Sequence, residues 1–271
     1  MAKHDLLTED EFAAYKVHPG TVQQLNKFAA SKGRSAGQVR VLDWGCGRGR
    51  FVLWLREQGF DAYGVDIDPE PVNNGLPLFE KKGYPNKPLS VISAEGRTEY
   101  DDGFFDFIVT NNVLEHVSDL GKVLDEIGRL TSKGGGGYHI FPAQRQPVEG
   151  HLFMPFVHWL PAGGLRKAVI RSCVRMGKEP HWTEVEGLDL EEKTQVYFAY
   201  SINHIFYRPF KTIREKFKQL GFKVTFLSLQ NPAVQKHRLL GPLARTSVLG
   251  PAINWLILTF KQVELLVERQ G

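Results

Sequence analysis

A glycine-rich turn that follows an apolar run constrains the fold of this chain more than any other feature. Three glycines stand at alternate positions after the run Val41–Trp44: Gly45, Gly47 and Gly49. Glycine lets the backbone turn sharply and approach a ligand closely, and a helix that begins after such a turn offers free N–H groups. The pattern therefore predicts a strand, a ligand-binding turn and a helix beginning near Arg50, although a tight turn that binds nothing is the alternative.

Short apolar runs and longer amphipathic stretches alternate up to Phe141. The runs predict strands at Val41–Leu42, Ala62–Val65, Leu89–Ile92, Phe105–Thr110 and Tyr138–Phe141. The stretches predict helices at Arg50–Gln58, Pro69–Lys82 and Leu120–Leu130, the second of them short or broken because it contains Pro71 and Pro77. This alternation is typical of an α/β fold with a Rossmann-like, doubly wound, mostly parallel sheet.

The alternation stops after Phe141. Residues 142–206 are rich in proline, glycine, histidine and aromatic residues without a clear period, so we expect an insertion over the carboxyl edge of the sheet. A helix at Pro209–Leu220 and a strand at Phe222–Leu227 follow, and Val263–Val267 forms either a last antiparallel strand or the end of a helix. We expect residues 1–271 to form a single domain, with 142–206 as a substrate-side insertion or lid.

The composition narrows the classes of function. The net charge of +4 is mild, and the lysines and arginines are scattered along the chain. Both observations argue against nucleic acid as a partner. Two cysteines, Cys46 and Cys173, provide no disulfide framework, and no signal-peptide core or membrane-spanning run is present, so we expect a cytoplasmic protein. The apolar segment Leu239–Phe260 is expected to be mostly buried; peripheral membrane contact or a homodimer is the alternative.

Two carboxylates stand at the ends of successive predicted strands. Asp43 precedes the glycine turn, where it can accept a hydrogen bond from a ligand ammonium, and Asp66 ends the next strand, where it can hold ribose hydroxyls. A helix cap is the alternative for Asp66, but Asp68 is better placed to cap a helix that begins near Pro69.

These residues resemble the class I S-adenosylmethionine-dependent methyltransferases. The resemblance begins at Asp43-x-Gly45-x-Gly47-x-Gly49, which differs from the G-x-G-x-x-G turn of dinucleotide enzymes. It continues through Val65–Asp68, Ser93–Glu95, Phe105–His116, Gly134–Phe141 and Gly221–Val224.

The resemblance implies S-adenosylmethionine as the cofactor and assigns its binding residues. Asp43, Gly45 and Gly47 would line its methionine part, Asp66 its ribose, Ala94 and Glu95 its adenine, and Asn111 the methionine carboxylate or the sulfonium. Ser93 stands where the family often has aspartate, which weakens the hydrogen bond expected to the adenine amine.

Histidines are the candidates for removing a proton from the acceptor. His116 follows Glu115 in a stretch similar to the Glu-x-x-Glu-His element that ubiquinone-pathway O-methyltransferases link to a divalent metal, but Asn112 replaces the first glutamate. His151 and His158 lie among aromatic residues of the insertion, and His151 is the preferred base. A structural role, in fixing a helix start or capping a core, is the alternative for all three. No pair of ligands has the usual metal spacing, so no metal site is expected.

The sequence thus predicts an S-adenosylmethionine-dependent methyltransferase that acts, at oxygen, on a small-molecule, glycan or lipid-linked acceptor. A nucleic-acid or protein methyltransferase is the second candidate. Asn111–Leu114 lacks the Asn-Pro-Pro-Tyr type of element, which argues against it. A binding module that has lost catalysis and a nucleotide-dependent oxidoreductase are less consistent with the intact Asp43, Asp66 and glycine spacing.

Overall fold

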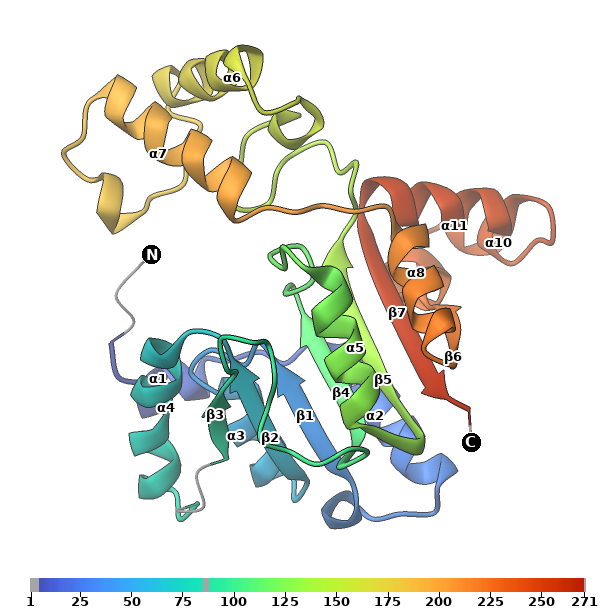
Figure 1. Cartoon of the computed structure of the whole chain (residues 1–271). Helices are drawn as coiled ribbons and strands as arrows, with labels where there is room; N and C mark the ends of the chain where they lie inside the picture. Colours follow the sequence, from blue (N-terminus) through green and yellow to red (C-terminus); the bar gives the residue numbers. More distant parts are fainter. Residues whose placement is uncertain (1–4, 85–87, 271) are drawn as a thin grey trace.

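One seven-stranded sheet forms the centre of the molecule (Figure 1). The computed structural model describes residues 5–84 and 88–270, apart from the side chains at 232 and 233. The strands are β1 (Arg40–Trp44), β2 (Asp61–Asp66), β3 (Leu89–Val91), β4 (Phe105–Asn111), β5 (Thr131–Pro142), β6 (Phe222–Phe226) and β7 (Gln262–Arg269). Their order is β3-β2-β1-β4-β5-β7-β6, and β7 alone runs in the direction opposite to the other six strands. The predicted Rossmann-like sheet with an antiparallel last strand is confirmed.

Helices cover both faces of the sheet. Successive residues of β1 point to opposite faces, so that Val41 joins one core cluster and Leu42 the other. The first cluster includes residues of α2 (Pro19–Ser31), α3 (Arg50–Glu57) and α4 (Pro69–Lys81), and the second includes residues of α5 (Leu120–Leu130) and α8 (Phe210–Gln219). The short α1 (Glu9–Ala13) begins with the capping box of Thr8 and Glu11.

The expected break in the helix after β2 is wrong, because α4 runs without interruption from Pro69 to Lys81. Pro69 and Pro71 lie in its first turn, where backbone N–H groups have no partner within the helix and proline costs little. Pro77 lies inside α4, whose apolar face still packs on the core through Val72 and Phe79. Packing therefore outweighs the one backbone hydrogen bond that Pro77 cannot donate.

The insertion at 142–206 is helical rather than irregular. It contains α6 (Gly164–Arg175) and α7 (Leu190–Asn203), with the single turns η2 (Val157–Trp159) and η3 (Thr183–Val185). It has a core of its own, built from Leu152, Met154, Val157, Ile170, Cys173, Val174, Val185, Tyr197 and Ile205. Figure 1 shows α6 and α7 beyond the edge at which β4 and β5 end. The periodicity was not evident in the sequence because the aromatic residues of α7 do not form a single apolar stripe.

The expectation that Leu239–Phe260 is mostly buried is wrong. The segment forms α10 (Leu240–Ala244) and α11 (Leu249–Phe260), which follow η4 (Ser228–Gln230) and α9 (Pro232–Gln235). Leu258 and the small residues Ala244 and Gly250 are buried, whereas most of the large apolar side chains are exposed. Two short helices at the edge of the sheet bury only one side, and no other described element covers the rest. None of the described helices is long and apolar enough to cross a membrane.

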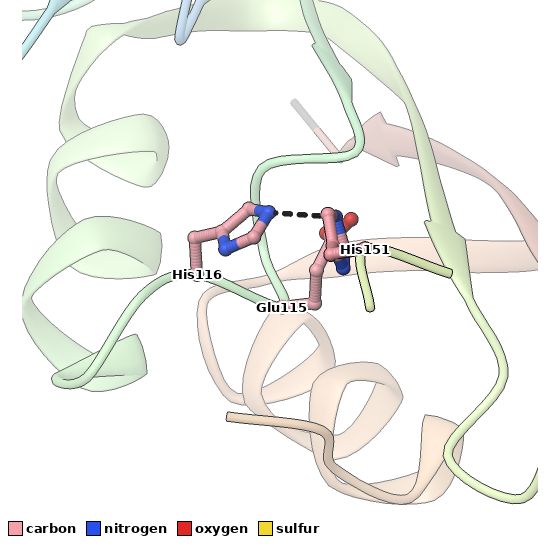
Figure 2. A group of neighbouring side chains, drawn as sticks. All are labelled: Glu115, His116 and His151. Atoms are coloured by element: carbon pink, nitrogen blue, oxygen red, sulfur yellow. Dashed lines mark hydrogen bonds between the residues drawn. The ribbon is translucent and has the colours of Figure 1, made fainter. Parts of the chain in front are cut away.

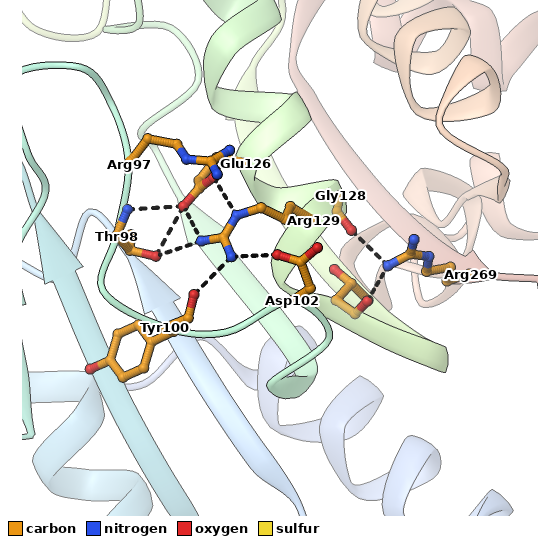
Figure 3. A network of polar contacts seen from close by, with 9 residues as sticks. Arg97, Thr98, Tyr100, Asp102, Glu126, Gly128, Arg129 and Arg269 are labelled. Carbon is orange, nitrogen blue, oxygen red and sulfur yellow. Dashed lines mark hydrogen bonds and ion pairs between the residues drawn. The ribbon is translucent and has the colours of Figure 1, made fainter.

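A polar network fixes the loop between β3 and β4 to α5 (Figure 3). The guanidinium of Arg129 donates to Glu126 at 2.6 Å, to Asp102 at 2.7 Å and to the carbonyl of Tyr100 at 2.8 Å. Glu126, whose side chain is 2% exposed, also accepts hydrogen bonds from the backbone and hydroxyl of Thr98. The network holds the loop that follows Ser93–Glu95 against α5.

Candidate active site

The glycine turn after β1 folds against the end of β2. The backbone N–H groups of Gly45 and Cys46 both donate to the carbonyl of Val65, at 2.8 and 3.0 Å. Gly45 has a φ of +82°, and a Cβ there would lie 2.4 Å from Val113, so only glycine fits. Gly47 also has a positive φ, but its Cβ direction is open to a distance of 4 Å. The turn is thus closed on the protein side and accessible on the side where a ligand would approach.

A pocket of about 190 Å³ lies beside this turn. It is lined by Asp43, Gly45, Cys46, Arg50, Phe51, Val109 and Asn111 from the sheet and first crossover, and by Tyr15, Val17, His18 and Thr21 from the N-terminal segment. Asp43, Gly45 and Asn111 were predicted from the sequence. Arg50 and His18 were not predicted. The only signals that could have suggested them are that Arg50 directly follows the glycine turn and that His18 directly precedes α2.

Asp43 gives this pocket its electrostatic character. Burial raises the pKa of Asp43 to about 7, and the negative charge of Asp66 adds to this effect. A buried carboxylate of this kind is stabilised in its charged form by a cation. The pocket therefore fits the ammonium group of an amino acid, and the nearby Arg50 offers a positive charge for a carboxylate.

Asp66 supports the turn from the end of β2. Its carboxylate accepts hydrogen bonds from the N–H of Gly47 at 2.8 Å and of Asp68 at 3.1 Å. Asp68, as predicted, caps α4 by accepting from the N–H of Glu70. Asp66 is therefore not the helix cap, and it lies half-buried next to the open side of Gly47.

The positions predicted to flank an adenine lie in an exposed turn after β3. Ala94 and Glu95 are exposed, and the hydroxyl of Ser93 accepts a hydrogen bond from the N–H of Arg97. Gly47, Asp66, Ala94 and Glu95 lie outside the lining of the 190 Å³ pocket. An extended ligand would thus place one end in the pocket and the other across the surface of β2 and β3.

A second group of polar side chains gathers beyond the ends of β4 and β5 (Figure 2). One ligand atom each from Glu115, His116 and His151 lies within 4.8 Å of the others. Nε2 of His116 and Nε2 of His151 are 3.0 Å apart. Nδ1 of His116 faces the carbonyl of His204 at 2.6 Å, and Nδ1 of His151 faces the carboxylate of Glu149 at 2.8 Å.

Glu149 organises this cluster although the sequence analysis did not single it out. Its side chain is fully buried and accepts hydrogen bonds from the ring and backbone of His151 and from the hydroxyl of Tyr207. Burial alone would raise the pKa of Glu149, but these hydrogen bonds and the charge of His151 lower it below its ordinary value. Glu149 and Tyr207 are 58 positions apart, so no local motif could have paired them.

Glu115 lies in the same cluster in an unusual state. Neither of its carboxylate oxygens has a hydrogen-bond partner among the described residues, and both are buried. Burial raises the pKa of Glu115 to about 7. The backbone carbonyl of Glu115 accepts from the N–H of Phe206, so the residue also ties the β4 loop to the end of the insertion. Glu115, His116 and His151 together offer oxygen and nitrogen lone pairs that can bind a proton or a metal cation.

His158, the third candidate, and His204 have different positions. The ring of His158 packs against the ring of Tyr207, with centroids 4.8 Å apart, and burial lowers its pKa. His204 contributes its carbonyl to His116, while its ring stacks on Tyr200. Among the predicted histidines, the structure thus brings His116 and His151 together and places His158 behind them.

Comparisons with known proteins point to one class. A family model described as a methyltransferase domain matches residues 11–226. A methyltransferase of Mycolicibacterium gilvum described as uncharacterized is 30% identical over 154 residues, which cover 56% of this chain and 57% of the relative. A ubiquinone biosynthesis O-methyltransferase of Acinetobacter baylyi is 25% identical over 193 residues, or 69% of this chain and 78% of the relative. The chain thus spans little more than half the length of the first of these relatives.

Solved structures agree in fold. The YcgJ protein from Bacillus subtilis has a TM-score of 0.53 at 15% identity, and the comparison covers 94% of this chain and 100% of that one. PKMT2 from Rickettsia typhi, solved in complex with AdoHcy, has a TM-score of 0.54 at 17% identity over 88% of this chain and 50% of its own.

Proposed function

This chain belongs to the methyltransferase domain family, and we propose that it is an S-adenosylmethionine-dependent methyltransferase that methylates a hydroxyl oxygen of a small-molecule, glycan or lipid-linked acceptor. The pairing of Glu149 with His151 carries this proposal, because it creates a base at the carboxyl edge of the sheet, where α/β folds bind ligands. The similarity to ubiquinone biosynthesis O-methyltransferases supports oxygen as the acceptor atom.

The cofactor would occupy the pocket at the glycine turn and the surface beside it. Asp43 would bind its ammonium, with Gly45 and Asn111 against the methionine part, while Gly47 allows close approach. Asp66 would hold the ribose hydroxyls in addition to the backbone of Gly47, and the turn at Ala94 and Glu95 would flank the adenine. When bound, the cofactor supplies a methyl group on a positively charged sulfur, which is a good leaving group.

His151 would act as the base. The acceptor oxygen would take the methyl group that the cofactor supplies, with the carbon–sulfur electron pair left on sulfur, and the hydroxyl proton would pass to Nε2 of His151. Glu149 holds Nδ1 and stabilises the positive ring that results, as a carboxylate does for histidine in other acid–base sites. Because Nε2 of His116 contacts the same Nε2 of His151, the acceptor hydroxyl would have to displace His116 from that position.

The insertion 142–206 would serve as the lid of this site. It contributes Glu149 and His151, and the carbonyl of His204 near its end faces His116 in the loop after β4. Tyr207, directly after the insertion, donates to Glu149. Its separate core would keep these contacts in place while its aromatic residues exclude water from the acceptor.

A second candidate role for the cluster is to hold a divalent cation, although the sequence spacing predicts no metal site. Two observations favour it: the carboxylate of Glu115 has no hydrogen-bond partner in the described part of the chain, and the Nε2 atoms of His116 and His151 face each other. Each histidine also directs Nδ1 at an oxygen, which is how metal-binding histidines are usually oriented. A cation there would lower the pKa of a nearby hydroxyl.

Two experiments test the proposal. Turnover of labelled cofactor would be measured against panels of phenols, glycans, lipid-linked hydroxyls, nucleic acids and proteins; transfer only to nucleic acid or protein would contradict it and support the second candidate function. Dialysis against EDTA then separates the two roles of the cluster. With His151 as the base, turnover survives EDTA; loss of turnover that added Mn²⁺ or Zn²⁺ restores would assign the role to the cation.

A further inference from the structure

The segment 232–261, here called the C-terminal helical segment, concentrates exposed apolar side chains. Eight of the seventeen large hydrophobic residues that are exposed in the described part of the chain belong to it. They are Leu239, Leu240, Leu243, Val248, Leu249, Trp255, Leu256 and Phe260. Such a concentration is more than the scattered apolar residues of an ordinary surface, and it marks a site of contact.

The same segment carries the whole net charge of the protein. It contains four lysines and arginines and no aspartate or glutamate: Lys236, Arg238, Arg245 and Lys261. The chain has 34 basic and 30 acidic residues, so the remaining 30 basic and 30 acidic residues cancel. No ion pair within the described residues involves these four cations. The segment thus combines exposed apolar side chains with exposed cations that form no ion pair among the described residues.

We propose that the C-terminal helical segment docks on an anionic lipid bilayer. Short helices that expose leucine and tryptophan and carry only positive charge have the chemistry of an interfacial membrane surface. A second copy of this chain fits less well, because a symmetric contact would place these uncompensated cations against their own counterparts. The segment attaches to the membrane without crossing it, since α10 and α11 are five and twelve residues long.

Docking there would bring the acceptor site close to the lipid. The end of α11 is hydrogen-bonded to the segment that follows β5, since Arg145 donates to the carbonyl of Thr259 at 3.1 Å. Gln146 comes next and donates to Tyr207, the partner of Glu149. Figure 1 shows α11 at the start of β7, beside the end of β5. If the acceptor is lipid-linked, which rests on the function proposed above, its hydroxyl would reach the site from this side.

Vesicle flotation of the full chain tests the proposal. We expect the protein to float with vesicles of phosphatidylglycerol and phosphatidylcholine and to remain below with phosphatidylcholine alone. Arg238→Gln combined with Arg245→Gln should weaken binding about fivefold per charge removed. Leu239→Ser combined with Val248→Ser should abolish flotation without unfolding, because these side chains are 68% and 78% exposed.

The control variant is Leu6→Ser combined with Met176→Ser, which changes exposed apolar residues elsewhere and should float like wild type. Absence of flotation, or equal flotation of wild type and the Leu239/Val248 variant, would overturn the proposal. So would a wild-type dimer on a sizing column that the Leu239/Val248 variant converts to a monomer, since that result would assign the surface to a second copy. Flotation does not require turnover, so its failure is distinguishable from a failure of the methyltransferase assays.

Discussion

Nε2 of His116 and Nε2 of His151 lie 3.0 Å apart while the Nδ1 atom of each ring already faces an oxygen. Each Nδ1 must donate, so neither Nε2 carries a proton when both rings are neutral. One additional proton between the two nitrogens makes the contact favourable. Of the two rings, His151 has the greater affinity for this proton: burial lowers the pKa of both histidines, but in His151 the hydrogen bond and charge of Glu149 outweigh burial and raise the pKa. His151 can accept a proton from the acceptor only after it has released this one, so the proposed reaction requires both rings to be neutral.

Glu149→Gln should change the pH dependence of turnover. Glu149 raises the pKa of His151, so its loss lowers that pKa and leaves the ring neutral at lower pH. The acidic limb of kcat/KM should therefore move to lower pH, while the maximal rate falls about 10²-fold because the base is weaker and less well oriented. Tyr207→Phe is the matched control: it removes one hydrogen bond to Glu149 but keeps the charge, so its acidic limb should stay close to that of wild type. An unchanged acidic limb in Glu149→Gln would remove Glu149 from the mechanism.

Alanine substitution should separate the two histidines of the insertion. His151→Ala should reduce kcat by about 10²–10⁴-fold, as loss of a general base does. His158→Ala should have a smaller effect, because His158 packs behind Tyr207 and does not reach the cluster. Steady-state kinetics with the acceptor identified from the panels would measure both. Full turnover in His151→Ala would refute its assignment as the base.

Asp66→Ala should weaken binding of S-adenosylmethionine. The loss of a charged hydrogen bond to the ribose costs on the order of 1.5–3 kcal/mol, which calorimetry would detect as a weaker Kd. Asp68→Ala is the matched control, since Asp68 caps α4 and should affect stability but not affinity. Equal affinities of wild type and Asp66→Ala would disprove the ribose assignment. Because Asp66 also holds the N–H of Gly47, a thermal melt should accompany each measurement.

Glu126→Gln should destabilise the protein in a way that depends on pH. Burial alone would raise the pKa of Glu126, but hydrogen bonds from Arg129 and Thr98 outweigh it and lower the pKa. When folding lowers the pKa of a carboxyl group, that group stabilises the fold at pH values above its pKa in the unfolded chain. This contribution is lost as the pH falls through the pKa of the group in the folded protein. The variant should lose about 1–3 kcal/mol at neutral pH. Thermal melts from pH 7 to pH 3 should show the difference from wild type shrinking with acid; a constant difference would contradict the account.

The fold and the positions of the proposed cofactor-binding residues were predictable because their signals are local. Strands, helices and the glycine turn leave periodic or contiguous patterns, and Asp43 and Asp66 stand next to them in the chain. The parallel strands β1, β2 and β4 have their carboxyl ends at one edge of the sheet. Residues that end these strands therefore come together independently of the conformation of the loops. The capping of α4 by Asp68 followed from the same local rules.

Tertiary structure alone decided the acid–base cluster and the exposed surface. His116 and His151 are 35 positions apart, and their contact depends on how the insertion closes over β4, which no spacing rule describes. Sequence hydrophobicity likewise shows that Leu239–Phe260 prefers to leave water but not whether another element of the chain is available to cover it. Burial needs a partner, and the position of the partner is a property of the folded chain.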